Sequence, residues 1–334
     1  MLKPDAFDPP PGFQFGHFTN AKGADIRYGQ VKASGESKGT IVILPGFREN
    51  IEKYNEVMRD MLARGFDIFI MDWAGQGGSE RAIKAHPQKA HSEGYNAQIE
   101  TLHQFMQTVV EPAAKKPLLM MGHSMGAHLG MRYLKEHDGV FDSAMLSSPM
   151  IDIVTAGLPK PLARQMAKFA KAGNYLEKYI PGGTDWVEEK FEGNNKTSDP
   201  ERFHAYSNYV AANDFLKIGD PTYGWIYHTF SSVDTLGDED YLKAIKTPIL
   251  MEITDHDKIV ERAAQDRAIK LLPDVKVVEI KGAKHEIWME RDELRDKWVA
   301  KVDEFLLERL KLAAAATAAP KKPKPPGNPR PPAP

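Results

Sequence analysis

The sequence predicts an α/β fold: a mostly parallel central sheet with helices on both faces and a helical cap inserted into it. Between residues 40 and 149, short apolar segments alternate with longer segments of helical periodicity, as in doubly wound parallel sheets. Residues 151–235 contain no clear strand and several prolines and glycines, which favours a helical cap. The alternation then resumes, so residues 13–150 and 236–312 are expected to form one core.

Each predicted element follows from a local pattern. The first two strands flank the turn at 21–23, and the later strands are apolar and often β-branched, as expected when both faces of a sheet are covered. The helices carry apolar residues at helical spacing. The expected strands are 13–20, 25–32, 40–44, 67–71, 118–121, 143–146, 247–253 and 275–280. The expected helices are 51–63, 92–110, 127–133, 161–179, 260–272 and roughly 290–311.

Composition narrows the class of protein. The 334 residues suit one large domain with an insertion, flanked by a Pro-rich arm (1–12) and a Pro- and Lys-rich tail (313–334) expected to be disordered. A net charge of −2 gives no reason to expect nucleic-acid binding. The absence of cysteine excludes disulfides, thiol catalysis and Cys-based zinc sites. Without a signal-peptide core or an apolar run of about eighteen residues, the protein is expected to be cytoplasmic.

Residues 122–126, Gly-His-Ser-Met-Gly, stand between a predicted strand and a predicted helix. Gly-x-Ser-x-Gly in that setting is the pattern of a nucleophile elbow, in which a tight turn raises the serine above the sheet. Glycines two positions either side allow the close passage of neighbouring backbone. Ser124 is therefore the candidate nucleophile, although it could instead cap the helix. Ser79, in the glycine-rich loop 72–79, lacks this setting and is interpreted as a loop residue.

A serine nucleophile needs a base and an acid that orients the base, in the chain order serine, acid, histidine. His285 follows the last predicted strand and is the candidate base. The acid should follow the preceding strand, where Asp257 is favoured over Asp255, which could instead accept hydrogen bonds within the turn. Asp152 is a third, weaker candidate for the acid.

Further site residues are expected around the elbow. Backbone N–H groups of Met125 and of Phe47, after the strand 40–44, are expected to form the oxyanion hole. The expected substrate-binding residues are Gly46, where backbone can approach the ester, with His123, Phe169 and Trp225.

These motifs together resemble the α/β-hydrolase superfamily. Residues 72–79 are similar to the Asp-x-x-Gly-x-Gly-x-Ser loop of its lysophospholipase and monoacylglycerol-lipase branch, and residues 219–225 look like a segment of the bacterial lysophospholipase L2 type. Pro45 stands where that branch usually has a histidine before glycine. Because the oxyanion hole uses a backbone N–H as donor in this loop, we expect the hole to form without that histidine.

The resemblance implies the α/β-hydrolase fold and a serine hydrolase that uses no metal or cofactor. It would cleave carboxylic esters of single-chain lipids, releasing fatty acid and a glycerophospho-alcohol through an acyl-enzyme. Alternatives are a monoacylglycerol lipase, a general carboxylesterase, and a peptidase or thioesterase on the same residues. A non-catalytic binding protein on this scaffold is disfavoured by the complete serine, acid and histidine set.

The predicted helix 161–179 has an apolar and a basic face. The apolar face carries Leu162, Met166, Phe169 and Leu176, and the basic face carries Lys160, Arg164, Lys168 and Lys171. Such a helix can lie on an anionic membrane, which would bring the protein to the inner membrane face as a peripheral partner. The favoured alternative is a lid helix whose apolar face covers the site. The oligomeric state, the acyl-chain length and the role of the tail stay open.

Overall fold

The computed structural model describes residues 6–155 and 157–318 and contains an eight-stranded, mostly parallel sheet. The strand order is β1-β2-β4-β3-β5-β6-β7-β8, with antiparallel pairing only between β1 and β2 and between β2 and β4. The strands are β1 (Gln14–Thr19), β2 (Asp25–Val31), β3 (Thr40–Leu44), β4 (Asp67–Met71), β5 (Leu118–His123), β6 (Ser143–Ser147), β7 (Ile249–Ile253) and β8 (Val275–Glu279). This arrangement confirms the predicted fold class.

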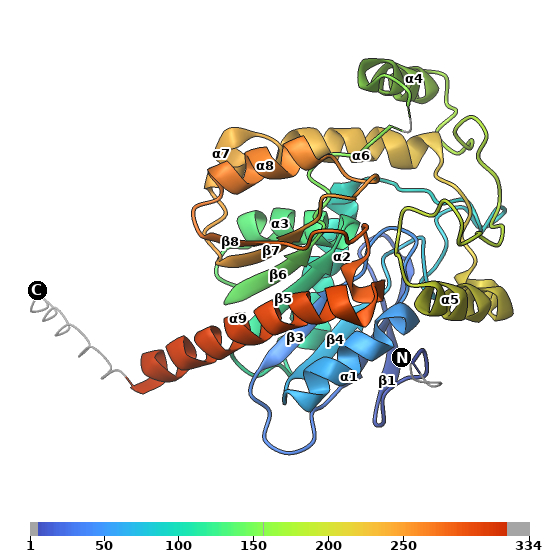
Figure 1. Ribbon diagram of the computed structural model, residues 1–334. Helices are drawn as coiled ribbons and strands as arrows, with labels where there is room; N and C mark the ends of the chain where they lie inside the picture. Colours follow the sequence, from blue (N-terminus) through green and yellow to red (C-terminus); the bar gives the residue numbers. More distant parts are fainter. Residues whose placement is uncertain (1–5, 156, 319–334) are drawn as a thin grey trace, which may run out of the picture.

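Helices cover both faces of the sheet (Figure 1). The helices are α1 (Asn55–Ala63), α2 (Tyr95–Phe105), α3 (Met125–Glu136), α4 (Lys160–Ala172), α5 (Pro200–Ala212), α6 (Tyr223–Leu236), α7 (Glu239–Lys243), α8 (Arg262–Leu271) and α9 (Asp292–Ala318). One apolar layer joins the sheet to α1 and α9, and the other joins it to α2, α3, α6 and α8. Strands β3 to β7 are buried along their whole length because both layers cover them.

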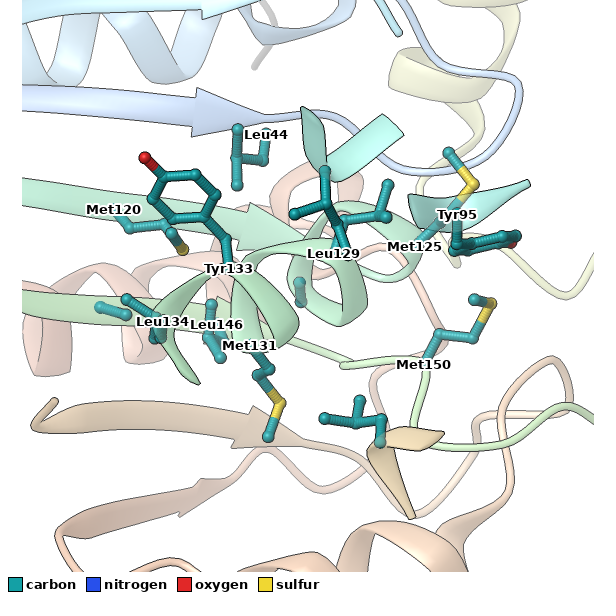
Figure 2. Packing of buried hydrophobic residues seen from close by; sticks show 14 of the residues in the cluster. Leu44, Tyr95, Met120, Met125, Leu129, Met131, Tyr133, Leu134, Leu146 and Met150 are labelled. Carbon is teal, nitrogen blue, oxygen red and sulfur yellow. The ribbon is translucent and has the colours of Figure 1, made fainter. Parts of the chain in front are cut away.

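Helix α3 begins directly after Ser124 and is fixed against the sheet. Its Leu129, Met131 and Leu134 lie in a buried cluster with Leu44, from β3, and Leu146, from β6 (Figure 2). Every residue of α3 from Met125 to Leu134 is buried. The N-terminal end of this helix is therefore held rigidly beside the turn that carries the serine.

Several element boundaries differ from the sequence prediction for local reasons. The predicted helix 92–110 begins only at Tyr95, after Gly94 with φ +124°, and its last turn is a π-helix, η2 (Met106–Val110). The predicted helix 51–63 starts as a 3₁₀ turn, η1 (Ile51–Tyr54). The predicted helix 161–179 ends at Ala172, followed by Gly173 and the left-handed Asn174.

The ends of the chain also differ from the prediction. Residues 313–318, expected to belong to a disordered tail, continue α9, because alanine is the strongest helix former. The rest of that tail lies outside the described residues. In the N-terminal arm, Ala6 and Phe7 are buried and pack with Met289, which ties this part of the arm to the body.

The segment between β6 and β7 forms helices and loops in its described residues, 151–155 and 157–235. Two of its helices, α5 and α6, were not predicted; α6 packs beside α3 and α2, and α4 lies on the outer side of α6 (Figure 1). Two further 3₁₀ turns occur, η3 (Asp214–Leu216) within the segment and η4 (Ile287–Met289) after β8. Arg202, near the start of α5, joins this segment to the core, since it forms ion pairs with Glu56, on α1, and Asp292, on α9.

Candidate active site

Ser124 lies on a strained turn between β5 and α3. Its φ of 51° and ψ of −114° are unfavourable for a residue with a side chain. A Cβ on Gly126 would lie 2.1 Å from the carbonyl oxygen of Leu44, and one on Gly122 would lie 2.9 Å from the Cα of Ala127. The two glycines are thus required by close backbone approach. The side chain of Ser124 makes no helix-capping hydrogen bond, so the alternative role as an N-cap is not adopted.

The structure brings the three predicted residues of the triad together. His285 Nε2 lies 2.8 Å from Ser124 Oγ, and His285 Nδ1 lies 2.6 Å from Asp257 Oδ2. The other oxygen of Asp257 accepts hydrogen bonds from the N–H groups of Ile259 and Val260, at 2.8 and 3.1 Å. Asp257 is therefore oriented by backbone donors, and it in turn orients the imidazole toward the serine.

The rival acids Asp255 and Asp152, and the buried Glu252 at the end of β7, have other partners. Asp255 accepts a hydrogen bond from the N–H of Gly282 at 2.8 Å, the turn role considered for it. Asp152 pairs with Lys160 at 2.8 Å. Glu252 accepts from the N–H of Ser148, and its burial raises its pKa to about 8. Of these four carboxylates, only Asp257 lies within hydrogen-bond distance of His285.

The site is buried, and this determines its ionisation. Burial alone would lower the pKa of His285, but the charge of Asp257 and the hydrogen bond to it outweigh burial, so the pKa is raised above 6.5. Burial would raise the pKa of Asp257, but the charge of His285 and three hydrogen bonds lower it. An imidazole whose protonated form is stabilised by a buried carboxylate is suited to act as a general base.

Two backbone donors face no acceptor. The N–H groups of Phe47 and Met125 make no hydrogen bond within residues 6–155 and 157–318. Phe47 lines the same cavity as Ser124, and Met125 is the first residue of α3, directly after the serine. Side chains fix the loop that contains Phe47. The N–H of Gly46 donates to the carboxylate of Glu49, and the carbonyl oxygen of Gly46 accepts a hydrogen bond from the side chain of Gln76 at 2.8 Å. These two donors have the chemistry of an oxyanion hole.

A buried group of charges lies behind this loop. Lys53 Nζ is 2.7 Å from Glu49 and 2.8 Å from Glu286, the residue after the candidate base. The ring of His123 is tilted by 54° against that of His285, with centroids 4.9 Å apart, and its Nδ1 is 3.1 Å from Ser147 Oγ. Burial lowers the pKa of His123 to about 4, so this imidazole is neutral near pH 7.

A cavity of about 230 Å³ opens above Ser124. Much of its apolar wall comes from the segment 151–235, and this part was not found from the sequence. The apolar residues of that segment that line it are Trp186, Phe203, Val210, Leu216 and Ile218. The spacing of Phe203, Tyr206, Ser207 and Val210 along α5 is helical, a signal that could have identified this wall.

Only some of the predicted substrate-binding residues line the cavity. Gly46 and His123 line the cavity. Trp225 is 7% exposed, and its ring lies 4.0 Å from that of Phe47, beside the site rather than in the cavity wall. The expectation for Phe169 is wrong in this structure: its side chain is 66% exposed and does not line the cavity.

The orientation of α4 explains the error. The helix packs through the small residues Ala163, Ala167 and Ala170, while Leu162 and Phe169 point outward. Several residues of the predicted basic face of α4 form contacts with the rest of the protein instead of remaining free. Lys160 pairs with Asp152 and Glu261, Arg164 pairs with Asp234, and Lys171 bonds to Tyr227. The lid alternative, in which the apolar face covers the site, is therefore not the arrangement observed.

Comparisons with known proteins show relatives in sequence and in fold. Lysophospholipase L2 of Escherichia coli (strain K12) is 29% identical over 290 residues, which cover 83% of each chain. A soluble variant of monoglyceride lipase from Saccharomyces cerevisiae has a similar structure, with a TM-score of 0.71 and 18% identity over 91% of this chain and 98% of that one. A carboxyl esterase from Bacillus coagulans gives a TM-score of 0.70 and 17% identity over 90% of this chain and 100% of that one.

The Hydrolase_4 family, described as serine aminopeptidase S33, matches residues 35–292. That range contains the elbow, Asp257, His285 and the whole segment between β6 and β7. The chain therefore belongs to the Hydrolase_4 family of α/β-hydrolases and is a carboxylic ester hydrolase.

Proposed function

We propose that this protein hydrolyses the carboxylic ester of lysophospholipids and releases a fatty acid and a glycerophospho-alcohol. The observation that carries the proposal is the chain of hydrogen bonds from Asp257 through His285 to Ser124, at 2.6 and 2.8 Å. Ser124 attacks the acyl carbonyl while His285 takes its proton. His285 then protonates the leaving alcohol, and water, activated by the same imidazole, releases the fatty acid.

The negative charge that develops on the carbonyl oxygen would be stabilised by the N–H groups of Phe47 and Met125. The apolar wall formed by residues such as Phe203 and Val210 would hold the acyl chain. No step in this sequence needs a metal or an organic cofactor. Similarity to proteins named lysophospholipase L2 along 83% of the chain supports the choice of lipid.

The test is the rate of hydrolysis of a panel of esters with one acyl chain: a lysophosphatidylethanolamine, a 1-monoacylglycerol and a p-nitrophenyl ester. We expect the lysophospholipid to have the highest kcat/KM, and we expect Ser124→Ala to abolish turnover and labelling by a fluorophosphonate. A preference for the monoacylglycerol would assign the protein to that lipase activity instead. Labelling that survives in Ser124→Ala would overturn the role of the serine.

We also propose peripheral contact with an anionic membrane, at the inner face of the cytoplasmic membrane. No helix among the described residues is long and apolar enough to cross a bilayer. The outer face of α4 exposes Leu162 and Phe169, and the chain before it exposes Val154 and Leu158. The side chain of Lys168 has no ion-pair or hydrogen-bond partner in the described part of the chain and would face lipid phosphates. Apolar side chains flanked by cations favour the surface of an anionic bilayer.

A further inference from the structure

One side of the cavity above Ser124 is charged. Arg48, Glu189 and Lys196 line the same cavity as the serine and the candidate base. Lys196 is closely paired with Glu189, with Nζ 2.6 Å from the carboxylate. The guanidinium of Arg48 is held less closely, at 3.7 Å from Glu189 and 3.5 Å from Asp220. Charge-assisted hydrogen bonds are usually about 2.7 to 2.9 Å long, so Arg48 keeps donors available for another anion.

The position of Arg48 is set by the oxyanion loop. It directly follows Phe47, and its backbone has φ +61°, a left-handed conformation that arginine seldom adopts. Its N–H donates to the side chain of Gln76 at 3.2 Å, and the same side chain bonds to the carbonyl oxygens of Gly46 and Glu49. This network fixes the origin of the arginine side chain relative to the place where an ester carbonyl would lie. Its guanidinium, 24% exposed as a side chain, lies at the cavity wall.

The other charges near the cavity floor are already paired. Lys53 lies between Glu49 and Glu286, and the side chains of all three are 10% exposed or less. They cannot leave this arrangement without losing ion pairs in a buried place, which is costly. A charged part of a substrate would therefore meet Arg48 and the Lys196–Glu189 pair in the cavity wall, with Asp220 beside Arg48.

We propose that Arg48 binds the phosphate of a zwitterionic lysophospholipid head group, and that Glu189 and Asp220 take its ammonium group. The inference rests on the proposed function and adds the residues that select the leaving alcohol. On binding, the guanidinium of Arg48 gives up its long contacts to Glu189 and Asp220 and forms short hydrogen bonds to the phosphate. The ammonium group of the substrate then takes the place of the guanidinium beside these two carboxylates. Positive and negative charges balance before and after binding. The neutral glycerol of a monoacylglycerol gains neither contact.

The experiment compares lysophosphatidylethanolamine with a 1-monoacylglycerol of the same acyl chain, in the same detergent micelles. The readout is the ratio of the two kcat/KM values. General damage to the oxyanion loop would lower kcat/KM for both substrates alike and would leave their ratio unchanged. Loss of one hydrogen-bonded charge pair is expected to lower this ratio tenfold to about a hundredfold in Arg48→Gln. Arg48→Lys should recover part of it, since lysine keeps the charge but not the two-pronged geometry.

Arg64→Gln is the matched control, because Arg64 has a similar side-chain exposure, 26%, and pairs with Asp303 on α9, away from the cavity. It should leave the ratio unchanged. An unchanged ratio in Arg48→Gln would overturn the head-group role while leaving lysophospholipid hydrolysis intact. A wild-type enzyme that cleaves monoacylglycerol but no lysophospholipid would overturn both proposals.

A second measurement avoids the lipid surface. Glycerophosphoethanolamine should inhibit hydrolysis of a soluble p-nitrophenyl ester competitively, and glycerol at the same concentration should not. In Arg48→Gln the inhibition constant should rise at least about tenfold. Equal inhibition of the wild type and Arg48→Gln would contradict a phosphate contact at this residue. Equal inhibition by glycerol would contradict recognition of the head group altogether.

Discussion

The carboxylate of Glu49 accepts a hydrogen bond from the backbone N–H of Gly46 and pairs with Lys53 Nζ at 2.7 Å. A buried charge thereby holds the residue that precedes Phe47. Burial opposes its ionisation, but the charge of Lys53 and the hydrogen bonds from Lys53 and Tyr54 lower the pKa of Glu49 to about 2, so the carboxylate stays ionised. The backbone of the proposed oxyanion hole is thus supported by a buried ion pair at the wall of the cavity.

Replacing Glu49 by Gln should lower kcat about tenfold with a smaller effect on KM, because the hole acts on the transition state. The measurement is steady-state kinetics on a soluble ester. Glu52→Gln is the control: Glu52 is equally buried but pairs with Arg27, away from the cavity. Both variants should lose thermal stability. Equal losses of kcat in the two would mean that Glu49 contributes only to folding.

The pH dependence of kcat/KM should follow His285. The base must be neutral to take the serine proton, and its pKa is raised above 6.5, mainly by Asp257 acting against burial. Activity should therefore rise with pH through a midpoint above 6.5 and level off at alkaline pH. In Asp257→Asn, the residual activity should titrate at lower pH, since the charge that raises the pKa is lost. A midpoint unmoved by this substitution would argue against the pairing.

The two rival aspartates can be separated directly. Asp257→Asn should lower kcat by a factor on the order of 10⁴, because the amide cannot hold the imidazole in the required tautomer. Asp255→Asn should change it by no more than about twofold, since an amide oxygen can still accept the N–H of Gly282. Single-turnover acylation rates provide the comparison. A large loss in Asp255→Asn alone would reverse the assignment.

Gly126→Ala tests the close approach at the elbow. Its Cβ would lie 2.1 Å from the Leu44 oxygen and 2.4 Å from the Pro45 oxygen, so backbone must shift. We expect a lower melting temperature and a loss of kcat greater than about tenfold. Gly130→Ala, one turn further along α3, is the control, because its Cβ would meet chiefly the flexible sulfur of Met120. Similar behaviour of the two variants would contradict a specific need for glycine at position 126.

The outer face of α4 can be tested with anionic vesicles. Leu162→Ser and Phe169→Ser should each weaken binding about tenfold, since each removes apolar surface available to the bilayer. Leu307→Ser on α9 is a matched control, being 54% exposed against 49% for Leu162. Vesicle co-sedimentation measures the effect, and the rate on a soluble ester reports whether the fold is intact. Equal binding of the vesicles by all variants would contradict the proposal that this face of α4 contacts the membrane.

The sequence by itself determined the order of strands and helices in the core. It also identified the elbow, the candidate base His285 and the turn that carries the acid, because local turn chemistry and buried strands leave direct patterns in the chain. Tertiary structure chose Asp257 over Asp255, since only packing decides which of two neighbouring carboxylates points at His285.

Tertiary structure also decided which face of α4 is buried. Apolar periodicity shows that a helix has two faces, but not which neighbour each one meets. Here the close approach of α4 to α6 selects alanines for the contact, leaving Leu162 and Phe169 outside and giving the cavity wall to α5.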